Sequence, residues 1–176
     1  MSPSHCFLLS ILLLLFSILH TPSEASSSPT ELVVKICKRT SNYSFCVESL
    51  YSDSHTSNAD QYTLAFTAVR LAYVFANSTR AHISQLLKND SQHRKPLQRC
   101  ILGYDQAVSA LEKAYNDLNS ETFFELADFA DQAAASANDC EAAFQGNPSP
   151  PLGNRNKDLK GLCEICGIIG KLFTGQ

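Results

Sequence analysis

The chain has 176 residues, of which 44% are hydrophobic and 18% are charged, and its formal net charge is −3. This balance is typical of a folded globular protein and excludes a disordered or low-complexity chain. Nucleic-acid-binding proteins usually carry a basic surplus, which is absent here, so we expect no nucleic-acid partner. The length suits one domain with a substantial core.

The chain opens with an uncharged run over residues 7–19. Thirteen residues are too few for a membrane-spanning helix, which needs about 20. The run is typical of a secretory signal peptide, and Ser23 and Ala25 place small residues at positions −3 and −1 of a cleavage site. We therefore predict a cleaved signal peptide over residues 1–25 and a single mature domain over 26–176, with no membrane attachment after cleavage. A short signal anchor is the alternative, because no Lys or Arg precedes the run.

Cleavage removes Cys6 and leaves six cysteines in a compartment where disulfides are the default. Three N-glycosylation sequons fit the same route. They begin at Asn42, Asn77 and Asn89.

The first elements of the mature chain are two short helices, expected over residues 31–39 and 43–51. Helices of this length are marginal alone in water. Cys37 and Cys46 lie nine residues apart across the polar turn and are placed to join them. We predict a disulfide-stapled α-hairpin extension over residues 30–55.

Four longer helices follow. The first is expected over residues 60–88, the second begins near Pro96, which suits a first helical turn, and the last covers 156–173. Apolar residues recur every three or four positions over 97–118 and again over 123–144, which predicts a second and a third helix, with Ser120 as the N-cap of the third. The sequence thus predicts an all-α fold in which the hairpin precedes an up-down four-helix bundle over residues 58–173.

The remaining cysteines fall on these helices. Cys100 lies near the start of the second helix and Cys140 near the end of the third, so antiparallel packing brings them together. Cys163 and Cys166 form a C-x-x-C motif within the last helix. We interpret both as free thiols packed in the core, and a further bridge or a metal or redox site is the alternative. No second C-x-x-C and no His pair with ligand spacing accompany the motif, so we expect no metal and no cofactor.

These features together resemble the plant invertase/pectin methylesterase inhibitor family, over about residues 30–173. The motifs that carry the resemblance are Cys37-Lys-Arg-Thr-Ser-Asn-Tyr-Ser-Phe-Cys46, Leu97-Gln-Arg-Cys100 with Tyr104, Asp139-Cys140-Glu141 with Phe144, and Leu162-Cys163-Glu164-Ile165.

The resemblance implies a non-catalytic inhibitor, a monomer that forms a 1:1 complex with a plant pectin methylesterase or an acid invertase. It also implies secretion to the apoplast and cell wall, with the vacuole as the alternative. Invertase inhibitors of the family often carry Pro-Lys-Phe near the start of the third bundle helix, where this chain has Thr122-Phe123-Phe124. We therefore favour pectin methylesterase as the target, with acid invertase as the alternative.

Candidate partner-binding residues lie in the same region. Phe124 is off the apolar stripe, and exposed aromatic side chains are enriched at binding hot spots. Packing against the adjacent loop and a plain solvated acidic face are the alternatives. The candidates are Thr122, Phe124, Glu125, Asp128 and Asp131.

Catalysis is not indicated. No carboxylate pair and no Ser/His/Asp set has a suggestive spacing, so we predict no catalytic residues. An enzyme and a carrier of a small apolar ligand stay as alternative classes, although the adjacent cysteine pair of plant lipid-transfer proteins is missing.

Overall fold

The computed structural model describes residues 28–147 and 149–175; the expected signal peptide lies outside them. Six α-helices and one 3-10 helix, with no β-strand, make up this part of the chain. None of the helices described is both long and apolar enough to cross a membrane. In chain order they are α2 (Glu31–Cys37), α3 (Tyr43–Tyr51), η1 (Ser54–Asn58), α4 (Gln61–Asn89), α5 (Arg94–Asn119), α6 (Leu126–Ala143) and α7 (Gly153–Thr174).

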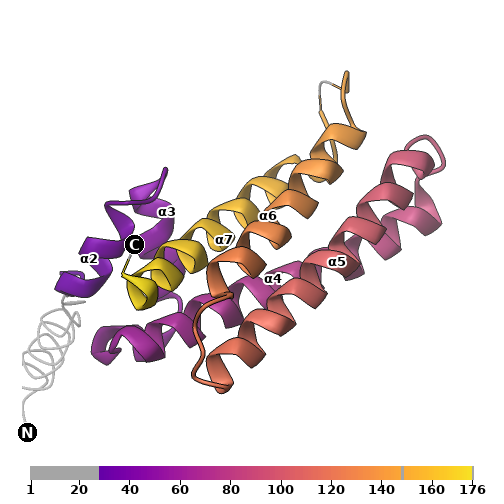
Figure 1. Ribbon diagram of the computed structural model, residues 1–176. Coiled ribbons are helices and arrows are strands. Elements are labelled where there is room, and N and C mark those ends of the chain that lie inside the picture. Colours follow the sequence, from indigo (N-terminus) through magenta and orange to yellow (C-terminus); the bar gives the residue numbers. More distant parts are fainter. Residues whose placement is uncertain (1–27, 148, 176) are drawn as a thin grey trace, which may run out of the picture.

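The four long helices form an antiparallel up-down bundle (Figure 1). Each of them packs against the next in sequence, and α7 closes the ring against α4. The hairpin of α2 and α3 lies beside one end of the bundle, which we call the hairpin end; the α5–α6 connection lies there too (Figure 1). The α4–α5 and α6–α7 connections lie at the far end. The predicted fold class is therefore confirmed.

The core is built from the predicted apolar stripes. In α5 the stripe includes Leu97, Tyr104 and Leu111, all fully buried; burying a leucine side chain contributes about 1.5–3 kcal/mol. Small residues bring α5 and α6 close together, because a Cβ added at Gly103 would lie 3.1 Å from the carbonyl oxygen of Ser136. The two helices are thus packed almost backbone to backbone.

A disulfide and a buried hydrogen-bond chain lock the same helices. Cys100 of α5 is bonded to Cys140 of α6. Beside it, the amide of Asn156 donates to the sulfur of Cys140 at 3.5 Å and accepts from the hydroxyl of Tyr104 at 2.9 Å. This chain satisfies the polar groups of Asn156 and Tyr104 inside the core, and burial raises the pKa of Tyr104.

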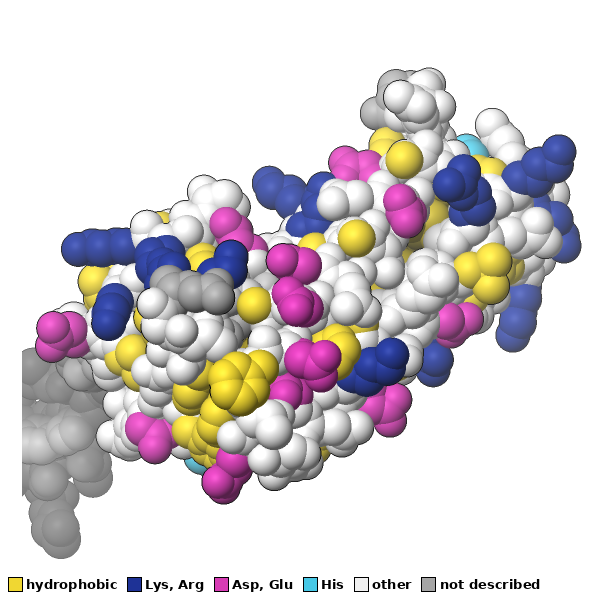
Figure 2. Space-filling view, viewed as in Figure 1, with side chains coloured by type: hydrophobic (Ala, Val, Ile, Leu, Met, Phe, Trp, Pro, Cys, Tyr) yellow, Lys and Arg dark blue, Asp and Glu magenta, His cyan; other side chains and the backbone are white. Residues whose placement is uncertain are grey.

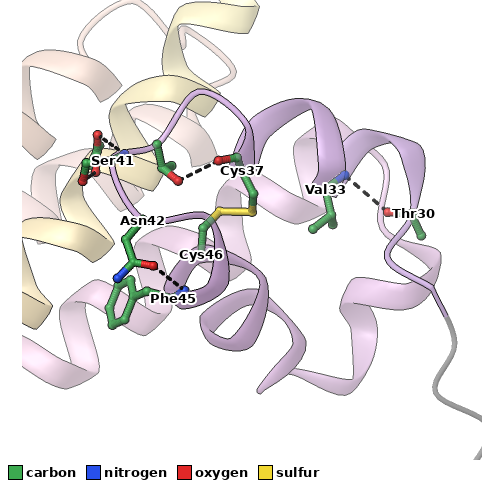
Figure 3. The surroundings of a disulfide bond; sticks show 9 residues. Thr30, Val33, Cys37, Ser41, Asn42, Phe45 and Cys46 are labelled. Carbon is green, nitrogen blue, oxygen red and sulfur yellow. Dashed lines mark hydrogen bonds between the residues drawn. A yellow bond between two sulfur atoms is a disulfide. The ribbon is translucent and has the colours of Figure 1, made fainter.

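The hairpin is held internally by the disulfide between Cys37 and Cys46 (Figure 3). Its helices begin at side-chain caps. The hydroxyl of Thr30 accepts from the backbone N–H of Val33 at 3.4 Å, and the side-chain oxygen of Asn42 accepts from that of Phe45 at 3.1 Å.

Contacts with α7 seat the hairpin on the bundle. The backbone N–H and the hydroxyl of Ser41 donate to the carboxylate of Glu164 at 2.9 and 2.7 Å. The ring of Phe45 lies over Gly161, where an added Cβ would come within 2.6 Å of its Cε1. Gly161 therefore leaves the space that the ring occupies.

The predicted start of the third bundle helix is wrong. α6 begins at Leu126, and Ser120 follows the end of α5 instead of capping α6. Phe123, which the spacing placed on the helix stripe, lies in the connection over residues 120–125 and has a positive φ of 61°. Helical periodicity did not reveal this difference, because side-chain contacts from outside the segment hold the connection in a non-helical path.

Candidate functional site

The connection over residues 120–125 is organised by one buried carboxylate. Asp117, near the end of α5, is only 8% exposed. Its side chain accepts hydrogen bonds from the hydroxyl of Thr122 and, at 3.3 Å, from the backbone N–H of Glu125. Two residues within the connection, Glu121 and Phe123, have positive φ angles of 54° and 61°. Such angles cost non-glycine residues about 1–3 kcal/mol each and persist only where surrounding contacts fix them.

Aromatic packing supplies the second anchor of this connection. The ring of Phe123 stacks on that of Phe173 in α7, with centroids 4.4 Å apart and planes 10° apart. The ring of Tyr62 in α4 meets Phe123 edge-on at 5.7 Å. Phe123 therefore faces the bundle, whereas the next residue, Phe124, is 76% exposed. The Phe123 stack and the hydrogen bond at Glu125 fix the backbone on either side of Phe124, whose large apolar side chain faces solvent.

Carboxylates surround this exposed ring. Residues 120–131 contain four Asp and Glu and no Lys or Arg. Glu125 and Asp128 are exposed beside Phe124, and Asp128 lies in the first turn of α6, where negative charge favours the helix dipole. Figure 2 shows exposed hydrophobic and acidic side chains gathered around the start of α6. We call residues 120–125 and the outward face of α6 as far as Asp131 the acidic aromatic surface.

The five predicted binding residues all lie on this surface. Phe124, Glu125 and Asp128 are neighbours around the helix start, and Asp131 follows about one turn later, on the edge that faces α7 near Gly167. Thr122 is different, since its hydroxyl is engaged with Asp117 and acts within the loop.

Two groups that shape the surface did not stand out in the sequence, namely Asp117 and the stack of Phe123 on Phe173. A signal for Asp117 was present. It is a charged residue placed between Ala114 and Leu118, on the side of α5 that the apolar stripe marks as buried. A buried carboxylate needs hydrogen-bond donors, which the following turn supplies.

The cysteines of the C-x-x-C motif are free and buried in α7; we call Cys163 and Cys166 the α7 thiols. Burial raises the pKa of Cys166 to about 12 and that of Cys163 well above its usual value. A thiol is reactive and binds metals as the thiolate, so neutral buried thiols favour the core-packing interpretation. Within the described residues, no group of three or more His, Cys, Asp and Glu is placed to hold a metal ion.

Comparison with known proteins identifies the family. A family model described as plant invertase/pectin methylesterase inhibitor matches residues 31–169. The chain belongs to this family. It is a family of inhibitors, so this chain is an inhibitor rather than a catalyst.

Relatives named for both targets are similar to this inhibitor. A "Pectinesterase inhibitor" of Actinidia deliciosa is 28% identical over 177 residues, covering 98% of this chain and 96% of its own length. A "Cell wall / vacuolar inhibitor of fructosidase 2" of Arabidopsis thaliana is 31% identical over 158 residues, covering 85% of each chain. The crystal structure of a mutant form of a pectin methylesterase inhibitor from Arabidopsis shares the fold, with a TM-score of 0.74 and 22% identity over 81% of this chain and 97% of that one.

Proposed function

We propose that this inhibitor binds pectin methylesterase one-to-one and blocks access to its active site. The family match over residues 31–169 is the observation that carries the proposal. Relatives are named for pectinesterase and for fructosidase, so the choice of target rests on the connection before α6. Thr122-Phe123-Phe124 lacks the cation and the proline of the invertase-directed Pro-Lys-Phe motif, and Phe124 presents a hydrocarbon ring instead.

The proposed docking site is the acidic aromatic surface. A fixed backbone that projects Phe124 reduces the entropy lost on binding. A few hot-spot residues near the centre of an interface, many of them aromatic, contribute most of the binding energy, and surrounding charges set orientation and association rate. Phe124 is therefore the proposed anchor, with Glu125, Asp128 and Asp131 as charged contacts.

Phe124→Ala tests this assignment. We expect the inhibition constant for pectin methylesterase to rise about tenfold or more, because a hot-spot aromatic is removed. The melting temperature should not change, because the side chain is 76% exposed. Leu102→Ala is the matched control, since Leu102 is 64% exposed on α5 and lies outside the proposed surface. Equal inhibition constants for parent and Phe124→Ala would contradict the assignment.

Acid invertase is the second candidate target. The relative that is 31% identical and is named as an inhibitor of fructosidase favours it. Inhibition of acid invertase without inhibition of pectin methylesterase would establish this alternative.

We further propose secretion to the apoplast after cleavage behind Ala25, with the vacuole as the alternative, and glycosylation at the three sequons. Asn42 and Asn89 are exposed, and Asn77 is half-buried within α4. At Asn42 the cap on α3 uses the side-chain oxygen, so the side-chain nitrogen is available for a sugar. Mass spectrometry of the protein recovered from apoplastic fluid, before and after enzymatic removal of N-glycans, tests both proposals.

A further inference from the structure

The far end of the bundle carries a concentrated positive charge. Lys88 lies in the last turn of α4, Arg94 and Lys95 begin α5, and Arg99 follows one turn later; all four side chains are exposed. Figure 2 shows Lys and Arg side chains gathered at the end of the molecule where α4 meets α5. We call these four residues the far-end basic patch.

The one acidic residue between positions 88 and 99 does not neutralise the patch. Asp90 accepts from the backbone N–H of His93 at 3.0 Å, and its second oxygen lies 2.8 Å from Nδ1 of the same residue. The hydrogen bond with the His93 ring is the main reason that the pKa of Asp90 is lowered. Among the described residues, no carboxylate lies within ion-pair distance of any of the four cations.

Local stability does not account for the two cations that begin α5, although Lys88 lies in the last turn of α4, where a cation is favourable. The start of a helix carries a partial positive charge, so Arg94 and Lys95 lie where the dipole of α5 disfavours cations. The first turn of α5 has no acidic residue and no side-chain cap. The basic residues of the hairpin differ, since Lys35 lies in the last turn of α2 and Lys38 directly follows that helix, where cations are favourable. The far-end basic patch therefore suits an external polyanion.

The patch and the acidic aromatic surface lie at opposite ends of the bundle. The patch lies around the first two turns of α5, a helix of 26 residues, which is about 39 Å long at 1.5 Å per residue. An enzyme bound at the hairpin end would therefore leave the far end open to a second, extended partner.

We propose that the far-end basic patch binds de-esterified pectin, an acidic polysaccharide with one carboxylate on each uronic acid unit. The choice of this polyanion rests on the proposed function. Pectin methylesterase hydrolyses each methyl ester with one water to a carboxylate, methanol and a proton, so its product is a polyuronate. Four exposed cations around the junction of α4 and α5 complement such a chain of carboxylates. The inhibitor is thereby retained on polymer that the esterase has already processed.

Calorimetric titration of the full mature protein with polygalacturonate oligomers tests this inference, and fully methyl-esterified oligomers serve as the uncharged probe. We expect binding to polygalacturonate alone, weakening as salt rises because the contacts are exposed charges. Two variants of equal net charge are compared. The patch variant is K88Q/R94Q/K95Q/R99Q, and the control variant is K35Q/K38Q/R39Q/K157Q.

The patch variant should bind polygalacturonate roughly tenfold more weakly or worse, because each neutralised cation removes one ionic contact with the polymer. The control variant should bind within about twofold of the parent, because the exposed cations that it loses lie outside the patch. Absence of binding by the parent, or equal loss in both variants, would overturn the inference. Equal binding of patch variant and parent would overturn it too.

Binding to purified pectin methylesterase, measured without any pectin, separates this inference from the proposed function. The patch variant should bind the esterase as the parent does. If the parent fails to bind the esterase while polygalacturonate binding still depends on the patch, the proposed function fails and the patch assignment stands.

Discussion

The disulfide between Cys100 and Cys140 offers a quantitative test of how the bundle is stabilised. The bridge closes a loop with a sequence separation of 40. Loop-closure entropy for a loop of that size gives a loss of about 4 kcal/mol when the bridge is removed. Replacement by alanine also takes away the sulfur that accepts from the buried amide of Asn156. An unsatisfied buried donor costs about 1–3 kcal/mol, so Cys100→Ala with Cys140→Ala should lose about 5–7 kcal/mol in total.

Equilibrium urea unfolding followed by circular dichroism measures this loss. Cys100→Ser with Cys140→Ser is the matched variant, because a hydroxyl at position 140 keeps an acceptor for Asn156, and it should lose only the cross-link contribution of about 4 kcal/mol. Cys37→Ala with Cys46→Ala removes a bridge that closes a loop with a sequence separation of 9, and it should lose about 2.6 kcal/mol. A loss below about 2 kcal/mol for the alanine pair at 100 and 140 would refute the reasoning.

Three further predictions concern the hairpin region and α7. Hydrogen bonds from the backbone N–H and the ring of His55 lower the pKa of Asp53 to about 2. The ionised Asp53 therefore stabilises the fold fully above its unfolded pKa of about 3.9, and this stabilisation is lost as pH falls through 2. Asp53→Asn should therefore lower the melting temperature at pH 6 and match the parent below pH 2, whereas an equal loss at both pH values would contradict this cause. The α7 thiols should resist a thiol-specific chromogenic reagent in native buffer and react at once in guanidinium chloride, because burial keeps them neutral; rapid reaction of the folded protein would disprove their burial. Gly161→Ala should make the hairpin more sensitive to proteolysis, because the added methyl group would occupy the place of the Phe45 ring. Gly167→Ala, whose added Cβ would lie 4.0 Å from its nearest neighbour, should behave as the parent. Equal cleavage of the two variants would contradict the seating of the hairpin.

Local sequence signals predicted most of the fold. The second hairpin helix has the predicted bounds, Tyr43–Tyr51, because Asn42 caps it and its apolar residues share one face. Most ends of the long helices lie within a few residues of the predicted positions, since apolar periodicity marks a helix better than it marks a terminus.

The start of α6 and the shape of the candidate site were not predictable in the same way. The spacing from Phe123 onward fits a helix, yet Phe123 packs on Phe173, fifty positions away in the sequence, and Asp117 holds the intervening turn. Both contacts depend on the assembled bundle, so tertiary packing overrides the local pattern. The sequence left both solvent exposure and packing against the adjacent loop open for Phe124, and it did not reveal the contacts that fix its backbone.

Titration of purified pectin methylesterase with the purified mature protein, with acid invertase in parallel from pH 4.5 to 7, tests the central claim most directly. Methylesterase activity should fall to its residual level near one inhibitor per enzyme, while invertase activity should be unchanged. Full methylesterase activity at a large excess of inhibitor would contradict the account.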